Sequence, residues 1–242
     1  MAGTVDRAGP GRLSARLRAG TRAGHDAAER TPFVVDLLAG RLPRQEYAAL
    51  TAQHFFIYES LESAAVAMAD DPVAGVFVFP ELTRLPAIIA DLEFLCGPDW
   101  ADRITASPAT AAYCARLREV AFDRPAAFIA HHYTRYLGDL SGGQDIGRVA
   151  AEVYGLVDAG RRFYIFDGVD PEAFRDRYRA QLDALSWPPA EEEYFLSEVS
   201  RAYLLNTTVL RELGERGGLA ERGRLGERGG LGQRDDLGER LS

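Results

Sequence analysis

The apolar residues of this chain recur every three to four positions over most of its length, and this spacing is typical of helices. The first helix is expected to begin at Leu13, because Leu13, Leu17 and the small residues after them fall on one face. Three later segments begin with a capping residue followed by proline, the usual start of an α-helix: Thr31-Pro32, Ser107-Pro108 and Asp170-Pro171. Helices do not alternate with strands, so the sequence predicts an all-α fold, a single-domain helical bundle.

The other predicted helices are defined by apolar periodicity. They cover residues 44–71, 85–96, 125–155 and 188–213. Residues 72–80 contain the apolar run VFVF, which could form a short strand, but no partner strand is visible and we interpret the segment as a loop. The helix over 125–155 is predicted to be continuous although it contains a cluster of glycines.

The two ends of the chain differ in composition from this helical region. Residues 1–11 are rich in glycine, alanine and proline and have no periodicity, which predicts a flexible arm. Residues 214–242 contain a 12-residue repeat of Gly, Glu, Arg and Leu, and each glycine opposes a helix by about 1 kcal/mol. The sequence therefore predicts a domain over residues 12–213, followed by a disordered low-complexity tail.

Charge and cysteine content exclude several classes of protein. The 28 basic residues, all arginine, are outnumbered by 36 acidic ones, which argues against a broad nucleic-acid surface and removes lysine chemistry. Cys96 and Cys114 are too far apart for a CxxC metal site and fit a reducing compartment. Without an apolar run of about 18 residues or a signal peptide, we expect a cytoplasmic protein with no membrane anchor.

The segment most informative about function is YTRYLGDLSGGQ at residues 133–144. Its three glycines, within a helical pattern, should cost roughly 3 kcal/mol relative to alanines. Gly138 and Gly142 share a face, so a flat ligand could lie against the backbone there; close helix packing or a kink is the alternative. Arg135 and Asp139, four residues apart, lie near the same face. A flat apolar ligand with a carboxylate nearby suggests a tetrapyrrole, and heme also needs an axial ligand.

The four histidines are the candidates for that ligand. His25 lies at the edge of the small-residue face of the first helix, where it could point into a cleft. His54 lies in an aromatic stretch and is interpreted as structural. His131 and His132 are adjacent, so they diverge by about 100° on a helix and cannot share one metal in the usual way.

Two motifs resemble those of the heme oxygenase family. TRYLGDLSGGQ at residues 134–144 is similar to the family's distal-helix signature. LSARLRAGTRAGHDAAE at residues 13–29 resembles its proximal helix, in which the histidine of a TxxxHxxAE pattern ligates heme iron. The similarity continues through FPEL, YRAQLDAL and LLNTTVLREL and covers residues 13–213. The resemblance implies a bundle that holds heme between a proximal helix and a glycine-rich distal helix.

The resemblance also implies a reaction. Heme b would be both substrate and cofactor, opened oxidatively to biliverdin, CO and ferrous iron with O2 and electrons from an external donor. An iron-bound hydroperoxide would attack a meso carbon, and Asp139 would anchor the water network that hydrogen-bonds it, supported by Arg135 and Tyr58. Ferredoxin, flavodoxin or a similar reductase is the expected electron donor, docking at an arginine-rich heme rim.

Further residues are assigned to heme binding by the same resemblance. His25 would be the axial ligand, Glu29 belongs to its motif, and Gly138 and Gly142 would contact the distal face. The propionates would be held by four arginines and one tyrosine hydroxyl, namely Arg18, Arg22, Arg175, Arg179 and Tyr133. The family has lysines at some of these positions, and arginine shifts the geometry toward bidentate carboxylate binding. Charge geometry by itself is equally compatible with an ordinary solvated helix face.

Three alternatives compete with this interpretation. A non-catalytic heme carrier would keep the ligand and the arginines but would have no use for Asp139. A thiaminase-like hydrolase on a related scaffold would need Cys96 or Cys114 as its nucleophile, and neither lies in a recognisable site. A ferritin-like di-iron oxidase is excluded because its Glu-x-x-His motif is absent. The residues three positions before the histidines are Arg22, Thr51, Phe128 and Ile129.

Overall fold

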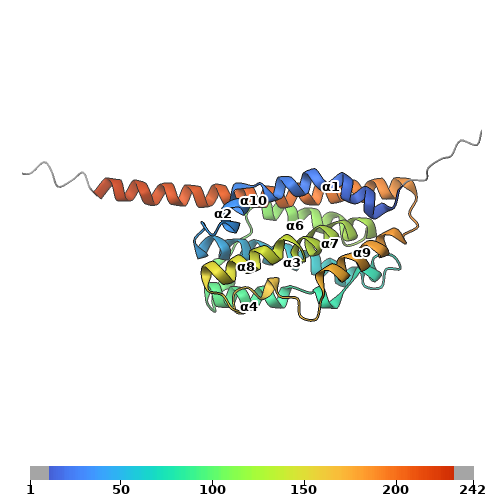
Figure 1. The fold of residues 1–242 in the computed structure, drawn as a ribbon, viewed down its shortest axis with the longest axis horizontal. Helices are drawn as coiled ribbons and strands as arrows, with labels where there is room; N and C mark the ends of the chain where they lie inside the picture. The colour runs from blue at the N-terminus through green and yellow to red at the C-terminus, as the bar shows by residue number, and fades with distance from the viewer. Residues whose placement is uncertain (1–10, 232–242) are drawn as a thin grey trace, which may run out of the picture.

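The computed structural model describes the backbone of residues 11–231 and the side chains of residues 11–217. Over this range the chain forms helices and no strands, which confirms the all-α prediction (Figure 1). The α-helices are α1 (Leu13–Glu29), α2 (Pro32–Leu38), α3 (Arg44–Met68), α4 (Leu85–Cys96), α5 (Trp100–Arg103), α6 (Pro108–Val120), α7 (Pro125–Asp139), α8 (Gly142–Tyr154), α9 (Pro171–Asp183) and α10 (Pro189–Leu231). Short 3-10 helices lie at η1 (Gly75–Phe77), η2 (Pro80–Leu82) and η3 (Arg162–Tyr164).

The helix starts follow the local signals in the sequence. Helices α2, α6 and α9 each begin with the predicted proline. The side chain of Ser107 accepts a hydrogen bond from the backbone N–H of Thr110, and Asp170 accepts from Glu172 and Ala173. These caps satisfy N–H groups that have no partner within the helix.

Helix α7 lies at the centre of the bundle, where it packs against α10, α3 and α6. Helix α1 lies along α10, and α10 extends past the rest of the bundle (Figure 1). A glycine permits the close approach of α1 to α10, because a Cβ on Gly24 would lie 3.0 Å from the Cβ of Tyr203. This arrangement places the histidine-bearing face of α1 opposite the glycine-rich segment of α7 and α8.

The predicted continuous helix over 125–155 is wrong, because α7 ends at Asp139 and α8 begins at Gly142. Side chains satisfy backbone carbonyls near the break. The Ser141 hydroxyl donates to the carbonyl of Leu137 at 2.7 Å, and the Gln144 amide donates to the carbonyl of Asp139 at 3.0 Å. The glycine-rich segment therefore turns between two helices while keeping its backbone hydrogen-bonded.

The predicted helix end near residue 213 is also wrong, because α10 continues through Leu231. Part of the reason is packing. A Cβ on Gly214 would lie 3.4 Å from Phe33, and one on Gly217 would lie 3.2 Å from Glu46, so bare backbone lets α10 lie close to α2 and α3. Residues 1–10 and 232–242 lie outside the described residues, so the arm and the end of the tail remain predictions.

The segment 72–80 forms no strand, as predicted, and contains η1. Asp71 organises its start, since its Oδ1 accepts hydrogen bonds from the N–H groups of Val73 and Ala74. Among the described helices, none is long and apolar enough to cross a membrane.

Candidate functional site

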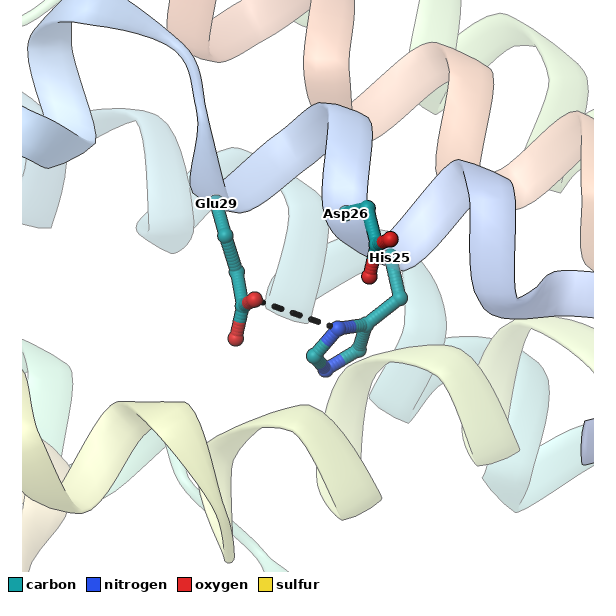
Figure 2. Close-up of side chains that lie close together, drawn as sticks. All are labelled: His25, Asp26 and Glu29. Carbon is teal, nitrogen blue, oxygen red and sulfur yellow. Dashed lines mark ion pairs between the residues drawn. The ribbon is translucent and has the colours of Figure 1, made fainter.

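Helix α1 presents a histidine with an acidic neighbour. The Nδ1 atom of His25 lies 3.5 Å from the Glu29 carboxylate one turn later, and both side chains point from α1 toward the yellow-green ribbon of α7 and α8 (Figure 2). The ring also makes an edge contact with Tyr203, with centroids 6.2 Å apart. Because Glu29 engages Nδ1, Nε2 is the nitrogen available to a metal. With Asp26, the donor atoms of this cluster lie within 4.8 Å of one another.

The glycines of α7 and α8 divide into two sets. A Cβ on Gly138 or Gly142 would meet no atom within 4 Å, so both expose bare backbone to open space. A Cβ on Gly143 would lie 3.4 Å from the Tyr164 ring, and one on Gly147 would lie 2.7 Å from the Tyr164 Cβ. Both sequence interpretations therefore apply, with an open face at 138 and 142 and close packing at 143 and 147.

Two adjoining pockets meet at His25, Gly138 and Tyr203. The outer pocket has a volume of about 940 Å³ and is lined by α1, α7, α9 and α10. The inner pocket has a volume of about 160 Å³ and is lined by α1, α2, α3, α7, α8 and α10 together with Tyr164. His25 and the open glycine face thus border one connected space.

Every cationic residue predicted to hold propionates lines the outer pocket. These are Arg18, Arg22, Arg175 and Arg179, joined by Tyr133. Some of their charge is already engaged, since Arg175 donates to the carbonyl of Leu140 at 2.9 Å and Arg179 pairs with Asp176 at 3.0 Å. Burial raises the pKa of Tyr133, while Arg179 and Arg18 oppose that shift, so the phenol is a hydroxyl donor at neutral pH.

The inner pocket contains a buried carboxyl group. Asp139 is 7% exposed and accepts a hydrogen bond from the Tyr58 hydroxyl. Burial raises the pKa of Asp139 to about 6, although Arg135 and the Tyr58 hydrogen bond pull it down. Tyr58 lines neither pocket and lies fully buried behind Asp139. Asp139 can therefore change protonation near neutral pH.

Arg135 lines the inner pocket but makes a different contact from the one its spacing indicated. It forms no direct ion pair with Asp139 within the part of the chain the structure describes; its Nη1 donates to the Asn206 side chain on α10 at 2.5 Å. Its guanidinium lies 5.0 Å from the centroid of the Tyr58 ring, and its Nε is buried without a hydrogen-bond partner there. Spacing of four on a helix permits a pair, but a long side chain can reach a neighbouring helix instead.

Asn206 and His54 line the inner pocket and were not among the predicted site residues. Asn206 belongs to the LLNTTVLREL motif, which was matched to the family without a role for any residue. His54 was interpreted as structural, and its ring does pack on Phe163 with centroids 4.8 Å apart, but it also lines the inner pocket. Their only sequence signal is a polar residue within an apolar helical segment, which does not identify a pocket.

Comparison with known proteins adds to this geometry. The family model described as heme oxygenase matches residues 11–212. The chain belongs to the heme oxygenase family. It is 36% identical over 202 residues to heme oxygenase 1 of Synechocystis sp., covering 83% of this chain and 84% of that protein. It is 35% identical over 211 residues to heme oxygenase 2 of Rattus norvegicus, covering 86% of this chain and 67% of that protein.

Solved heme oxygenases have the same fold. The crystal structure of heme oxygenase-1 from Synechocystis sp. PCC6803 in complex with heme has a TM-score of 0.82 at 34% identity, covering 90% of this chain and 99% of that one. Heme oxygenase from Leptospira interrogans has a TM-score of 0.78 at 35% identity, covering 83% and 99%. The predicted family, fold and heme-degrading enzyme class are confirmed.

The alternatives find no support. A TenA homologue from P. horikoshii OT3 has a TM-score of 0.62 at 15% identity, covering 85% of this chain and 99% of that one, and this likeness shows the fold alone. Neither cysteine lines the outer or the inner pocket. Cys114 is buried and its thiol lies 3.3 Å from the carbonyl oxygen of Phe56, and burial raises its pKa, so it is a poor nucleophile.

Proposed function

We propose that this heme oxygenase family member binds heme b in the outer pocket through His25. It would degrade the heme to biliverdin, CO and ferrous iron, using O2 and electrons from a separate reductase. The observation that carries this proposal is the pairing of a half-exposed imidazole on α1 with bare backbone at Gly138 and Gly142 across one connected space. An axial ligand and a flat face are what a planar metal macrocycle needs on its two sides.

The residues present fit heme. Open space beyond Gly138 and Gly142 accommodates a flat ring, and a methyl group at either position would intrude on it. The Nδ1 contact with Glu29 orients the His25 ring and leaves Nε2 for the iron. The arginines and Tyr133 of the outer pocket match two carboxylate side chains. When bound, heme supplies the iron at which O2 is activated and the carbon that is oxidised.

Asp139 and the residues that support it would bind and transfer protons. Asp139 uses one carboxylate oxygen to accept the Tyr58 hydroxyl, which leaves the other to accept a hydrogen bond from water in the inner pocket. Its pKa of about 6 keeps it largely ionised at neutral pH, yet lets it take up a proton transiently. Tyr58 holds this carboxylate through its hydroxyl, and Arg135 supports it through its positive charge and its contact with the Tyr58 ring. Delivery of protons through ordered water suits a carboxylate set back from the reacting atoms.

The test begins with an absorption spectrum of the protein with one equivalent of hemin, followed after adding reductant in air. We expect an imidazole-ligated Soret band that gives way to biliverdin absorption. His25→Ala should lose that spectrum and most turnover, whereas His132→Ala, which removes a buried histidine outside both pockets, should keep both. An unchanged spectrum in His25→Ala would show that another residue is the ligand.

We also propose that a ferredoxin, a flavodoxin or a similar acidic reductase docks at the arginine-lined rim of the outer pocket. Attraction between opposite charges speeds such encounters and is screened by salt. Turnover driven by ferredoxin should therefore slow as ionic strength rises, while turnover driven by a small neutral reductant should not. Equal salt dependence with both reductants would argue against docking at this rim.

A cytoplasmic location is part of the proposal. It is supported by Cys96 and Cys114, which are both free thiols in the structure. Free cysteines persist in reducing compartments.

A further inference from the structure

His54 on α3 is a buried histidine whose ring nitrogens lack hydrogen-bond partners in the described part of the protein. It is 8% exposed and lines the inner pocket, which it shares with Asp139, Gly138 and Gly142. Its ring contacts the ring of Phe163 at 4.8 Å and meets Tyr58 edge-on at 6.1 Å between centroids. Within the described part of the chain, no protein atom forms a hydrogen bond with either of its ring nitrogens.

The other buried histidines differ on this point. His131 contacts Glu198 at 3.0 Å through Nε2 and Tyr113 at 3.4 Å through Nδ1. His132 contacts the Tyr178 hydroxyl at 3.1 Å through Nδ1. Neither lines the outer or inner pocket. Since buried polar groups are nearly always hydrogen-bonded, a histidine that lacks a protein partner and borders a pocket must find its partner inside the pocket.

The inner pocket has the composition of a site that holds water. Much of its wall is apolar, but Arg135, Asp139 and Asn206 also face it. Apolar cavities stay dry, whereas a cavity with several polar groups binds water that makes two to four hydrogen bonds. Burial, together with the charge of Arg135, lowers the pKa of His54, so the ring is neutral and offers one donor and one acceptor.

We propose that His54 hydrogen-bonds water in the inner pocket and is a positioning residue for the water that contacts Asp139. Anchors on α3 and α7 would hold this water from two sides, which restricts its orientation more than Asp139 alone could. This inference rests on the proposed function, because it affects turnover only if protons reach bound heme through the inner pocket.

The hydrogen bond itself is tested in the heme-free protein, independently of activity. We would record the imidazole nitrogen signals of protein labelled with 15N at histidine and assign His54 by comparison with His54→Leu. The expected result is a neutral ring whose unprotonated nitrogen is shifted upfield by accepting a hydrogen bond, as in His131 or His132. An unprotonated nitrogen at the position of a free imidazole would overturn the proposal.

The positioning role is tested with heme bound, in three variants. His54→Leu keeps an apolar side chain without hydrogen bonds, His54→Gln restores a donor and an acceptor, and His132→Leu removes a buried imidazole outside both pockets. We expect His54→Leu to keep its heme affinity, to form biliverdin roughly tenfold more slowly and to release more of the consumed O2 as hydrogen peroxide. His54→Gln should recover both values, and His132→Leu should match the wild type.

An unchanged peroxide fraction and rate in His54→Leu would overturn the positioning role. The same holds if His132→Leu reproduces the defect, because the effect would then come from core packing. If the wild-type protein fails to degrade heme, the proposed function fails, while the 15N signals still decide whether His54 is hydrogen-bonded.

Discussion

At the scale of single residues, the site depends on a carboxyl group whose ionised form is disfavoured by burial in the fold. Asp139 is buried, and its pKa of about 6 lies above the ordinary value of 3.8 because burial disfavours the charge. The folded state therefore binds more protons than the unfolded state between those two values. Stability falls as pH rises through this window, and above about pH 6 the ionised group opposes folding by its full amount.

We predict that Asp139→Asn stabilises the heme-free protein at pH 7.5 and abolishes turnover. The asparagine oxygen can still accept the Tyr58 hydroxyl, and it carries no charge. The shift corresponds to about 3 kcal/mol at most, at roughly 1.4 kcal/mol per pKa unit. Urea unfolding at pH 4 and pH 7.5 measures the difference in unfolding free energy between the variant and the wild type. The gain in stability should be confined to pH 7.5.

The same variant should bind heme with wild-type affinity but form little biliverdin. A gain in stability of the same size at both pH values would contradict the assigned pKa. Biliverdin formation at the wild-type rate would contradict the proton-handling role.

At the scale of elements, the glycines of α7 and α8 have two different structural roles. Gly138 and Gly142 leave the pocket open, whereas Gly143 and Gly147 let η3 pack through Tyr164. Asp91 anchors η3 from α4, because its carboxylate accepts hydrogen bonds from the N–H groups of Arg162 and Phe163. The glycine cluster is thus held by packing on one face and open to ligand on the other.

Alanine substitutions should distinguish the glycines that leave the pocket open from those that allow close packing. Gly138→Ala should stabilise the heme-free protein by about 0.5–1 kcal/mol, because alanine suits a helix better and meets no atom, but it should weaken heme binding. Gly147→Ala should destabilise by about 1–3 kcal/mol, since its Cβ would lie 2.7 Å from the Tyr164 Cβ. Urea unfolding and hemin titration of both variants provide the check. Weaker heme binding in Gly147→Ala alone would reverse the assignment of the two faces.

At the scale of the whole molecule, one buried carboxylate joins three helices. Glu198 on α10 is 3% exposed and accepts from Arg116 on α6 at 2.6 Å. It also contacts His131 on α7 at 3.0 Å. Burial raises its pKa, but hydrogen bonds from His131 and Arg116 outweigh that effect and lower the pKa to about 2. The stability that Glu198 contributes is present above its ordinary pKa of 4.5 and is lost as pH falls toward 2.

We predict that Glu198→Gln destabilises the protein at pH 7 by about 3 kcal/mol, because Arg116 loses a buried partner. The loss of stability between pH 4.5 and 2 should also become less steep. Glu191→Gln is the matched control on the same helix, since Glu191 pairs with Arg124 at 3.5 Å near the surface. Acid unfolding followed by circular dichroism measures the stability of both variants. Identical unfolding curves for Glu198→Gln and Glu191→Gln would show that Glu198 does not couple the three helices.

The sequence by itself determined the helical class, most of the helix starts and many of the residues that border the site. Caps and prolines such as those at Ser107 and Asp170 act on groups a few residues away, so neighbours in the chain suffice to predict them. The long motif around Gly138 and the histidine at position 25 could likewise be identified from the sequence, although their roles remain predictions.

Only the tertiary structure decided the break between α7 and α8 and the continuation of α10 past residue 213. It also decided which glycines are open, that Arg135 contacts Asn206, and that His54 borders a pocket with no hydrogen bond to the described part of the chain. Each of these depends on groups far apart in the chain. Local propensity is worth about 1 kcal/mol per residue, and contacts of that size from a neighbouring helix are enough to override it.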